Sequence, residues 1–300
     1  IFWRIWAKTS SKRWRGLGPV SQPVTILYDT VRPEEKALTE AADKLGIKIE
    51  MVDCKNLVLD VDKKSQYNTV LQRCVSYYRN LHATAALEGM GANVINNLFC
   101  GVYAGNKLFT HMLLKNAGIQ TPFVNVAFSK DSALDALDKL GYPRVIKPTV
   151  GSWGRMVQRL NNRESAEGII EEREKMYPIY QIHYMEEFVQ RPPRDIRAIV
   201  IGDEVVGAIY RNSTTENWKT NTHLGGTAEV CKITPELEDI CIRARKCVQG
   251  QIVGIDLMES NERGLVVHEI NNTTEYRNVA RVTEVNIAGK ILEYAVKSGK

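Results

Sequence analysis

The strongest constraint on the fold of this chain is the order of short apolar runs and helix-forming segments in residues 24–100. The run VTILY at Val24–Tyr28 is short and continuously apolar, which predicts a buried strand. Pro33–Leu45 predicts a helix with a proline and acids in its first turn, and Gly46 can adopt the left-handed conformation that ends many helices. Ile47–Val52 predicts a second strand. A strand, a helix and a further strand in this order predict a parallel sheet.

The same pattern continues through the first third of the chain and then changes. Val70–Tyr77 and Val94–Asn96 predict further strands, and Ala83–Met90 predicts a helix. Residues 24–100 are therefore expected to form a small, doubly wound, Rossmann-like domain. The pair Gly202-Asp203 between two apolar runs predicts a hairpin, so the fold class is α/β with α+β character in the second half. The expected elements there are helices at Asn106–Asn116 and Glu164–Lys175, and strands at Val145–Pro148, Tyr180–Val189, Ile196–Ile201 and Val205–Ile209.

The formal net charge of +5 is concentrated at the start of the chain. Residues 1–23 contain no acid, and without their five basic residues the chain has 35 basic residues against 35 acidic ones. A balanced body gives no case for nucleic-acid binding, and no apolar run approaches the roughly 20 residues that cross a membrane. We expect residues 1–23 to be a basic tail outside the fold, either disordered or an artefact. Its basic residues are Arg4, Lys8, Lys12, Arg13 and Arg15.

Six cysteines are scattered along the chain without a CxxC pair. This spacing predicts neither a zinc site nor a small disulfide scaffold. Reduced, buried thiols in a cytoplasmic protein are the expectation. The cysteines are Cys54, Cys74, Cys100, Cys231, Cys241 and Cys247.

A lysine at a predicted strand end precedes a loop with two glycines, in the sequence KPTVGSWGR at Lys147–Arg155. Glycines let backbone N–H groups approach phosphate oxygens, and a lysine adds positive charge. The loop is not a Walker A loop, because no GK[ST] sequence closes it. Taken alone, the stretch is explained equally well as a plain strand and turn with a surface lysine.

Two acids and an amide lie on two predicted strands near the C-terminus. Asp256 lies in GIDLM, and Glu269 and Asn271 follow the apolar run LVVH. If these strands pair as a hairpin, their side-chain oxygens come together as the hard ligands that Mg²⁺ prefers. Solvated acids at strand ends are the alternative.

Arg197 alternates with apolar residues on a predicted strand, so its guanidinium needs an anionic partner. ATP phosphates or a substrate carboxylate would serve as that partner, and so would Glu186 or Glu187 in a structural ion pair. Arg211 follows on the next predicted strand. The polar loop Asn217–Gly226 ends in two glycines and predicts nothing specific by itself.

Taken together and in order, these segments resemble the ATP-grasp superfamily, and more closely the α-aminoadipate–LysW ligase family, which is related to the ribosomal-protein glutamate ligase RimK. The similarity extends from about Val24 to Val296. It implies an ATP-grasp fold with a pre-ATP-grasp domain at residues 24–100, a central subdomain at 101–190 and a C-terminal subdomain at 191–300, with ATP between the last two. The matching segments are VIKPTVGSWGRM, RPPRDIRAIVIGD, IYRNS, NWKTNTHLGG, GIDLMES and VVHEINNTTEYRN.

The resemblance also implies a role for each matching residue. The residues implied to bind ATP are Lys107, Lys147, Gly151, Ser152, Trp153, Gly154, Arg155, Glu186, Glu187, Phe188, Val189 and Asp195. Two Mg²⁺ ions would be bound by Asp256, Glu269 and Asn271. The reacting phosphate and carboxylate would face Arg197, Arg211 and Asn221, and the substrate would contact Asn221, Thr222 and Asn278.

The implied reaction joins the amino group of α-aminoadipate to the C-terminal glutamate side chain of LysW, a small acidic carrier protein, in lysine biosynthesis. A carboxylate oxygen is a poor leaving group, so the γ-phosphoryl group of ATP is first transferred to form an acyl-phosphate. Positioning and electrostatics suffice for this chemistry, and no protein nucleophile is required. By analogy with relatives, the protein is expected to be a homo-oligomer such as a tetramer.

The choice of amino acid depends on the residues after EYR. Relatives that use glutamate carry Gly-Phe where this chain has Asn278-Val279, whereas relatives that use α-aminoadipate carry Asn followed by Thr or a similar small residue. Asn278 therefore favours α-aminoadipate, while Val279 departs from both patterns. A glutamate–LysW ligase, a bifunctional enzyme and a RimK-type glutamate ligase remain open. A nucleotide-binding protein without turnover is disfavoured by the retained Asp256, Glu269, Asn271 and Arg211.

Overall fold

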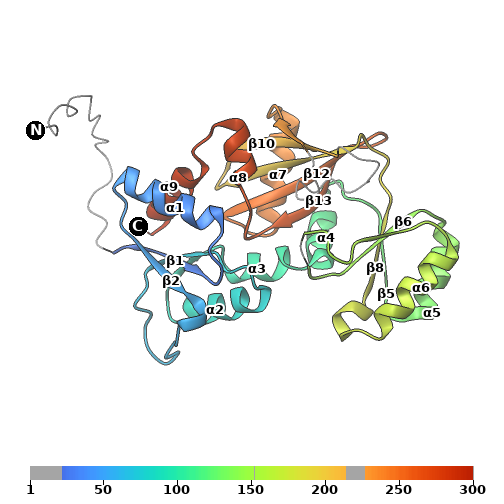
Figure 1. Cartoon of the computed structure of the whole chain (residues 1–300), viewed down its shortest axis with the longest axis horizontal. Coiled ribbons are helices and arrows are strands. Elements are labelled where there is room, and N and C mark those ends of the chain that lie inside the picture. The colour runs from blue at the N-terminus through green and yellow to red at the C-terminus, as the bar shows by residue number, and fades with distance from the viewer. Residues whose placement is uncertain (1–21, 152, 214–226, 300) are drawn as a thin grey trace, which may run out of the picture.

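Three β-sheets organise the computed structural model, which describes residues 22–151, 153–213 and 227–299 (Figure 1). The sheets have the strand orders β2-β1-β3-β4, β5-β8-β6-β7 and β11-β10-β9-β12-β13. Residues 1–21, which include nearly all of the basic tail, lie outside the described residues. The expected fold class is confirmed, because a parallel sheet forms the first third and antiparallel sheets form the rest.

The N-terminal sheet is parallel, as predicted, with β1 (Val24–Tyr28) between β2 (Ile49–Asp53) and β3 (Thr69–Gln72). Helix α1 (Pro33–Leu45) has the predicted bounds and ends at Gly46, whose φ of 66° lies in the left-handed region that glycine tolerates. The other elements of this part are η1 (Cys54–Asn56), α2 (Tyr77–Gly89), β4 (Asn93–Ile95), α3 (Leu98–Ala104) and α4 (Lys107–Asn116).

The predicted strand Val70–Tyr77 is too long, and the predicted helix Ala83–Met90 begins too late. Strand β3 ends at Gln72, because the backbone N–H groups of the following residues Val75 and Ser76 donate to the buried carboxylate of Asp29 at 2.8 and 3.1 Å. The side chain of Ser76 then caps the N-terminus of α2. A long-range carboxylate and a local cap therefore replace sheet pairing here.

The central sheet carries helices α5 and α6, which enclose a separate hydrophobic core (Figure 1). The predicted strand Tyr180–Val189 is too long at both ends, because its first residues belong to a 3-10 turn that starts at Pro178. The elements are β5 (Val124–Ala127), α5 (Lys130–Leu140), β6 (Arg144–Lys147), β7 (Gln158–Leu160), α6 (Arg163–Glu174), η2 (Pro178–Gln181) and β8 (His183–Glu187).

The C-terminal sheet is built from two hairpins joined through β9 and β12. The predicted hairpin around Gly202 is confirmed. Along β9, Ile196, Ala198 and Val200 pack into one core, while Ile199 and Ile201 pack into another, as the two-residue period of a strand requires. The elements are β9 (Arg194–Ile201), β10 (Glu204–Asn212), β11 (Thr227–Val230), α7 (Pro235–Cys247), β12 (Ile252–Ser260), β13 (Gly264–Asn271), α8 (Arg277–Thr283) and α9 (Ile287–Ser298).

Helix α9 joins the first and last parts of the chain, since it lies beside α1 in Figure 1. Its buried residues Ile291, Leu292 and Ala295 belong to the same core as Val24 and Leu38. The N-terminal and C-terminal sheets therefore share one hydrophobic core, whereas the central sheet has its own.

Within the described ranges, no helix has the length and apolar character needed to traverse a bilayer. All six cysteines lie in these ranges and are free thiols. Burial raises the pKa of Cys100 and Cys241 to about 12, so these two thiols are neutral at physiological pH.

Replacing Leu292 by alanine tests the shared core. Leu292 is 0% exposed, and we expect the variant to lose about 2–5 kcal/mol of the free energy of unfolding through lost burial and a residual cavity. Urea unfolding measures this loss. Val58→Ala is the matched control, because Val58 is 93% exposed and its truncation should change stability by less than about 0.5 kcal/mol. Equal effects of the two substitutions would contradict a shared core.

Candidate functional site

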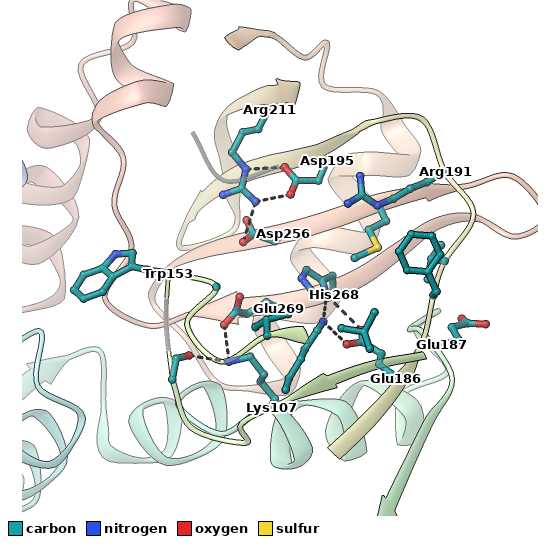
Figure 2. Close-up of a pocket in the computed structure, with 18 of the residues that line it drawn as sticks. Lys107, Trp153, Glu186, Glu187, Arg191, Asp195, Arg211, Asp256, His268 and Glu269 are labelled. Atoms are coloured by element: carbon teal, nitrogen blue, oxygen red, sulfur yellow. Dashed lines mark hydrogen bonds and ion pairs between the residues drawn. The ribbon is translucent and has the colours of Figure 1, made fainter. Parts of the chain in front are cut away.

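A cavity of about 240 Å³ lies between the central and C-terminal sheets (Figure 2). Most of the described residues predicted to form the site line it. These are Lys107, Lys147, Gly151, Trp153, Gly154, Arg155, Glu186, Glu187, Phe188, Val189, Asp195, Arg211, Asp256 and Glu269. Charged side chains from six strands, one helix and two connecting segments therefore meet in one place.

The predicted hairpin of β12 and β13 forms, and it brings Asp256 and Glu269 directly opposite each other. The register then shifts, because Leu257 pairs with Val267 and leaves His268 as an extra residue on β13. Such a β-bulge interrupts the alternation of side chains. As a result His268 and Glu269, although adjacent in sequence, both line the cavity (Figure 2).

Two arginines and two aspartates form an ion-pair network on one side of the cavity. Arg197 pairs with Asp256 through Nε and through Nη2, the latter at 2.8 Å. Arg211 donates to both oxygens of Asp195 at 2.6 and 2.8 Å and lies 3.2 Å from Asp256 (Figure 2). Burial raises the pKa of Asp256, but the two guanidinium charges outweigh burial and hold that pKa well below its usual value.

The structural partner of Arg197 is therefore Asp256 on the neighbouring strand. The predicted alternative pairing of Arg197 with Glu186 or Glu187 is wrong, because those glutamates lie on β8 of the central sheet and pair with other cations. Both guanidinium groups and both carboxylates are largely buried, so the network is fixed in place by mutual neutralisation.

Two lysines occupy the floor of the cavity. The Nζ atom of Lys107 lies 3.2 Å from Glu269 and donates to the carbonyl of Gly151 at 2.8 Å. Lys147 pairs with Glu186, and its Nζ atom lies 3.1 Å from Nδ1 of His268. Lys107 therefore connects α4 to β13 and to the glycine loop. Lys147 connects the central sheet to β13.

Glu186 is buried, which raises its pKa, but Lys147 and His268 outweigh burial and lower the pKa to about 2. Its neighbour Glu187 points the other way: it pairs with Arg263 and accepts a hydrogen bond from the N–H group of Phe123 at 2.9 Å. Arg159 lies over the ring of Phe188 at 4.1 Å. The strand end at 186–189 is therefore held by contacts on both sides.

The glycine loop closes one wall of the cavity. Gly154 and Trp153 both have φ near 60°, and Trp153 donates from Nε1 to Glu275 at 3.0 Å. Arg155 lies 5.0 Å from the Trp153 ring centroid. Ser152 lies outside the described residues, as do the predicted substrate-facing residues Asn221 and Thr222.

The donor set fits a magnesium ion that is completed by phosphates. In the described ranges, no group of three or more His, Cys, Asp or Glu side chains could hold a metal ion by itself. Asp256 and Glu269 nevertheless supply two facing carboxylates. Asn271 lies two residues after Glu269 on β13, and the oxygen of its amide is a further hard ligand of the kind that magnesium takes. Magnesium is usually bound by one or two carboxylates together with substrate phosphates.

Sequence reasoning missed several residues of the cavity wall, including Arg191, Met258 and His268. Arg191 is the first residue of the matching segment RPPRDIRAIVIGD, close after the predicted strand Tyr180–Val189. The sequence therefore contained a signal that Arg191 belongs to the site. His268 lies two residues after Val266, which pairs with the wall residue Met258, so the alternation of β13 could have placed it in the wall. Of the predicted site, Arg197, Asn271 and Asn278 do not line the cavity, although Arg197 contacts Asp256, which does.

Comparison with known proteins places these features in a family. Residues 24–99 match the LysX preATP-grasp domain and residues 104–295 match the RimK-like ATP-grasp domain. The alpha-aminoadipate–LysW ligase LysX of Sulfurisphaera tokodaii is 38% identical over 91% of this chain and 96% of its own length. The glutamate–LysW ligase ArgX of the same organism is 33% identical over 90% and 97%. The RimK-domain ATP-grasp structure from Sphaerobacter thermophilus has a TM-score of 0.77 at 22% identity, covering 91% and 98%.

The low pKa of Glu186 predicts a pH-dependent contribution to stability. A carboxylate whose folded pKa is lowered from 4.5 to about 2 stabilises the fold above pH 4.5, and this stabilisation is lost as pH falls through that range. Glu186→Gln should lose about 3–5 kcal/mol at pH 7, because Lys147 stays buried without its partner. The difference from wild type should shrink by about 2 kcal/mol by pH 3.

Urea unfolding at pH 7, 5 and 3 measures this difference. Glu40→Gln, at an exposed position in the middle of α1, is the control and should differ from wild type by less than about 0.5 kcal/mol at each pH. A Glu186→Gln deficit that stays constant from pH 7 to pH 3 would show that Glu186 is not held ionised by Lys147.

Proposed function

This chain belongs to the RimK-like ATP-grasp family of carboxylate–amine ligases, and from that premise we propose that it is a LysW ligase of amino-acid biosynthesis that uses α-aminoadipate. The observation that carries the proposal is the meeting of lysines, arginines and facing carboxylates in one cavity. Two features support α-aminoadipate: LysX is more similar to the chain than ArgX is, at 38% against 33% identity, and Asn278 occupies the selecting position.

The proposed roles follow from the charges around the cavity. We assign the phosphates of ATP to Lys107, Lys147 and the glycine loop 151–155, whose backbone groups and cations are suited to anionic oxygens. The adenine is assigned to the strand end 186–189, and the sugar to the neighbourhood of Asp195. The proposed architecture divides the chain into a pre-ATP-grasp domain at residues 24–100 and two subdomains, at 101–190 and 191–300, that enclose the nucleotide.

Asp256, Glu269 and Asn271 are the proposed ligands of two magnesium ions. Bound magnesium would neutralise phosphate charge during phosphoryl transfer. In the structure these carboxylates already contact cations, since Glu269 lies beside Lys107 and Asp256 beside Arg197 and Arg211. The same cations therefore keep both carboxylates ionised and so able to bind a divalent metal ion.

Arg197 and Arg211 are proposed to hold the reacting carboxylate and phosphate. Their guanidinium groups are anchored by Asp195 and Asp256, so they need little reorganisation when a further anion approaches. The carboxylate of the LysW C-terminal glutamate would accept the γ-phosphoryl group, and the amine of α-aminoadipate would displace phosphate from the acyl-phosphate. Asn221, Thr222 and Asn278 are proposed to contact the amino acid.

The proposal is tested by incubating the protein with Mg-ATP and a purified LysW protein, with α-aminoadipate or glutamate as the amino acid. We expect carrier-dependent ADP release with α-aminoadipate and a carrier mass gain of one aminoadipyl group. Transfer of glutamate alone would establish the ArgX-like alternative. Carrier-independent ADP release, or none with either amino acid, would overturn the assignment as a LysW ligase.

Glu269→Gln tests the assigned magnesium site. Removing one carboxylate charge should lower kcat by about 100-fold or more, because charge neutralisation is the main catalytic contribution in phosphoryl transfer. Glu262→Gln, in the exposed turn of the same hairpin, is the matched control and should retain wild-type turnover. Near-normal ADP production by Glu269→Gln, titrated with magnesium, would remove Glu269 from the site.

A further inference from the structure

The chain between β13 and α8 has no regular secondary structure, although it connects two parts of the proposed site. We call residues 272–276 the bridge segment. It starts immediately after Asn271, a proposed metal ligand, and ends two residues before Asn278, the proposed selecting residue. Because the segment is neither helix nor strand, its position depends on contacts with other elements.

The N-terminal domain supplies most of these contacts. Arg73 donates from Nη2 to the carbonyl of Thr274 at 3.2 Å, and Asn80 donates to the Thr273 hydroxyl at 3.2 Å. The hydroxyl of Tyr276 donates to the carbonyl of Glu34 at 2.8 Å. The N–H group of Arg277, the first residue of α8, donates to the Glu34 carboxylate at 3.2 Å. The end of β3 and the first turns of α1 and α2 thus hold the segment from one side.

Arg73 is the central residue of this contact. It is 4% exposed, and its Nε atom donates at 2.9 Å to Glu35, which is 0% exposed and also binds Arg32 at 2.8 Å. Burial raises the pKa of Glu35, but these two arginines outweigh burial and lower it, so the carboxylate is ionised. A buried ion pair adds little net stability, and such pairs are better known for fixing one arrangement of chains.

The opposite side of the bridge segment is also closely packed. A Cβ atom on Gly254 would lie 2.1 Å from the Thr274 hydroxyl, so the segment lies directly against β12. The carbonyl of Glu275 accepts a hydrogen bond from Arg197 at 3.4 Å, and its carboxylate accepts one from Trp153. The segment therefore cannot move without disturbing either the sheet or residues of the cavity.

We propose that Arg73 is a positioning residue for amino-acid selection: by holding the Thr274 carbonyl, it sets where the bridge segment delivers Asn278. Arg73 itself is no part of the cavity lining and touches no proposed ATP ligand among its described contacts. It acts through the backbone over a sequence separation of 201 residues. This inference rests on the proposed function, because it concerns which dicarboxylic amino acid the ligase prefers.

The test is the ratio of kcat/KM for α-aminoadipate to kcat/KM for glutamate, measured by carrier-dependent ADP release from the full chain. In Arg73→Lys the charge remains, but one nitrogen cannot reach both Glu35 and Thr274. We expect the ratio to fall about tenfold, since a displaced polar contact discriminates poorly between acids of different length. The KM for ATP should change by a smaller factor than this ratio does, because Arg73 itself lies outside the cavity lining.

Two matched controls and a milder variant support this test. Arg245→Lys alters an arginine that likewise pairs with a carboxylate, Asp203, and donates to a backbone carbonyl, but on the far end of the C-terminal sheet; the ratio should not change. Tyr276→Phe removes only the hydroxyl bound to Glu34 and should lower the ratio severalfold, even if Arg73→Lys does not fold. Tyr142→Phe, whose hydroxyl has no partner among the described residues, controls for that change.

The outcomes separate this inference from the proposed function. Wild-type protein that transfers neither amino acid to LysW would overturn both. Wild-type protein with equal kcat/KM for the two amino acids would leave a LysW ligase but overturn selection by this segment. A wild-type preference that is unchanged in folded Arg73→Lys and in Tyr276→Phe, or an equal loss with both amino acids, would overturn the role of Arg73 alone.

Discussion

Mutual neutralisation of buried charges is the constraint on which the rest of this structure depends. The cavity walls carry arginines, lysines and carboxylates that could not be buried singly, because an isolated charge loses far more hydration than the protein can replace. Each is instead paired with a charge from another element: Arg211 on β10 with Asp195 on β9, Lys107 on α4 with Glu269 on β13, and Lys147 with Glu186. The pairs thereby tie strands and helices into one geometry before any substrate is present. In the proposed reaction, phosphate oxygens would pair with some of these cations and magnesium ions with some of these carboxylates. The site can therefore accept a highly charged substrate without a large change in net charge.

The arrangement of hydrophobic cores complements this charge pairing. One core joins the N-terminal sheet, helix α9 and one face of the C-terminal sheet, while the central sheet encloses its own core with α5 and α6. The cavity lies between these two separately packed bodies, which is a common place for ligand sites. Helix α9 is the last element of the chain, yet it packs on the first. Because of that packing, the N-terminal domain is close enough to contact the bridge segment, although it contributes no residue to the lining of the cavity.

Local sequence patterns predicted much of the framework. The first strand and helix were predicted with their correct bounds, because VTILY is short and apolar and because Pro33 and Gly46 mark both ends of α1. The β9–β10 hairpin follows from its turn residues. One error arose where a distant group changed a local preference, because the Asp29 carboxylate ends the third strand early. A second was local, because the turn at Pro178 takes up residues assigned to the start of β8. Helix α5, which encloses the central core, was not predicted at all.

The sequence by itself determined that Asp256 and Glu269 lie near each other, because two apolar strands joined by a short turn pair as a hairpin. It also determined which residue types and motifs carry the family resemblance. Only the tertiary structure decided that Arg197 pairs with Asp256 rather than with Glu186, that a bulge brings Glu269 directly opposite Asp256, and that Arg73 holds Thr274. The physical reason is that a charge or a hydrogen-bond donor selects its partner by proximity after packing. Proximity between residues up to 201 positions apart is set by how sheets and helices stack, which no local pattern encodes.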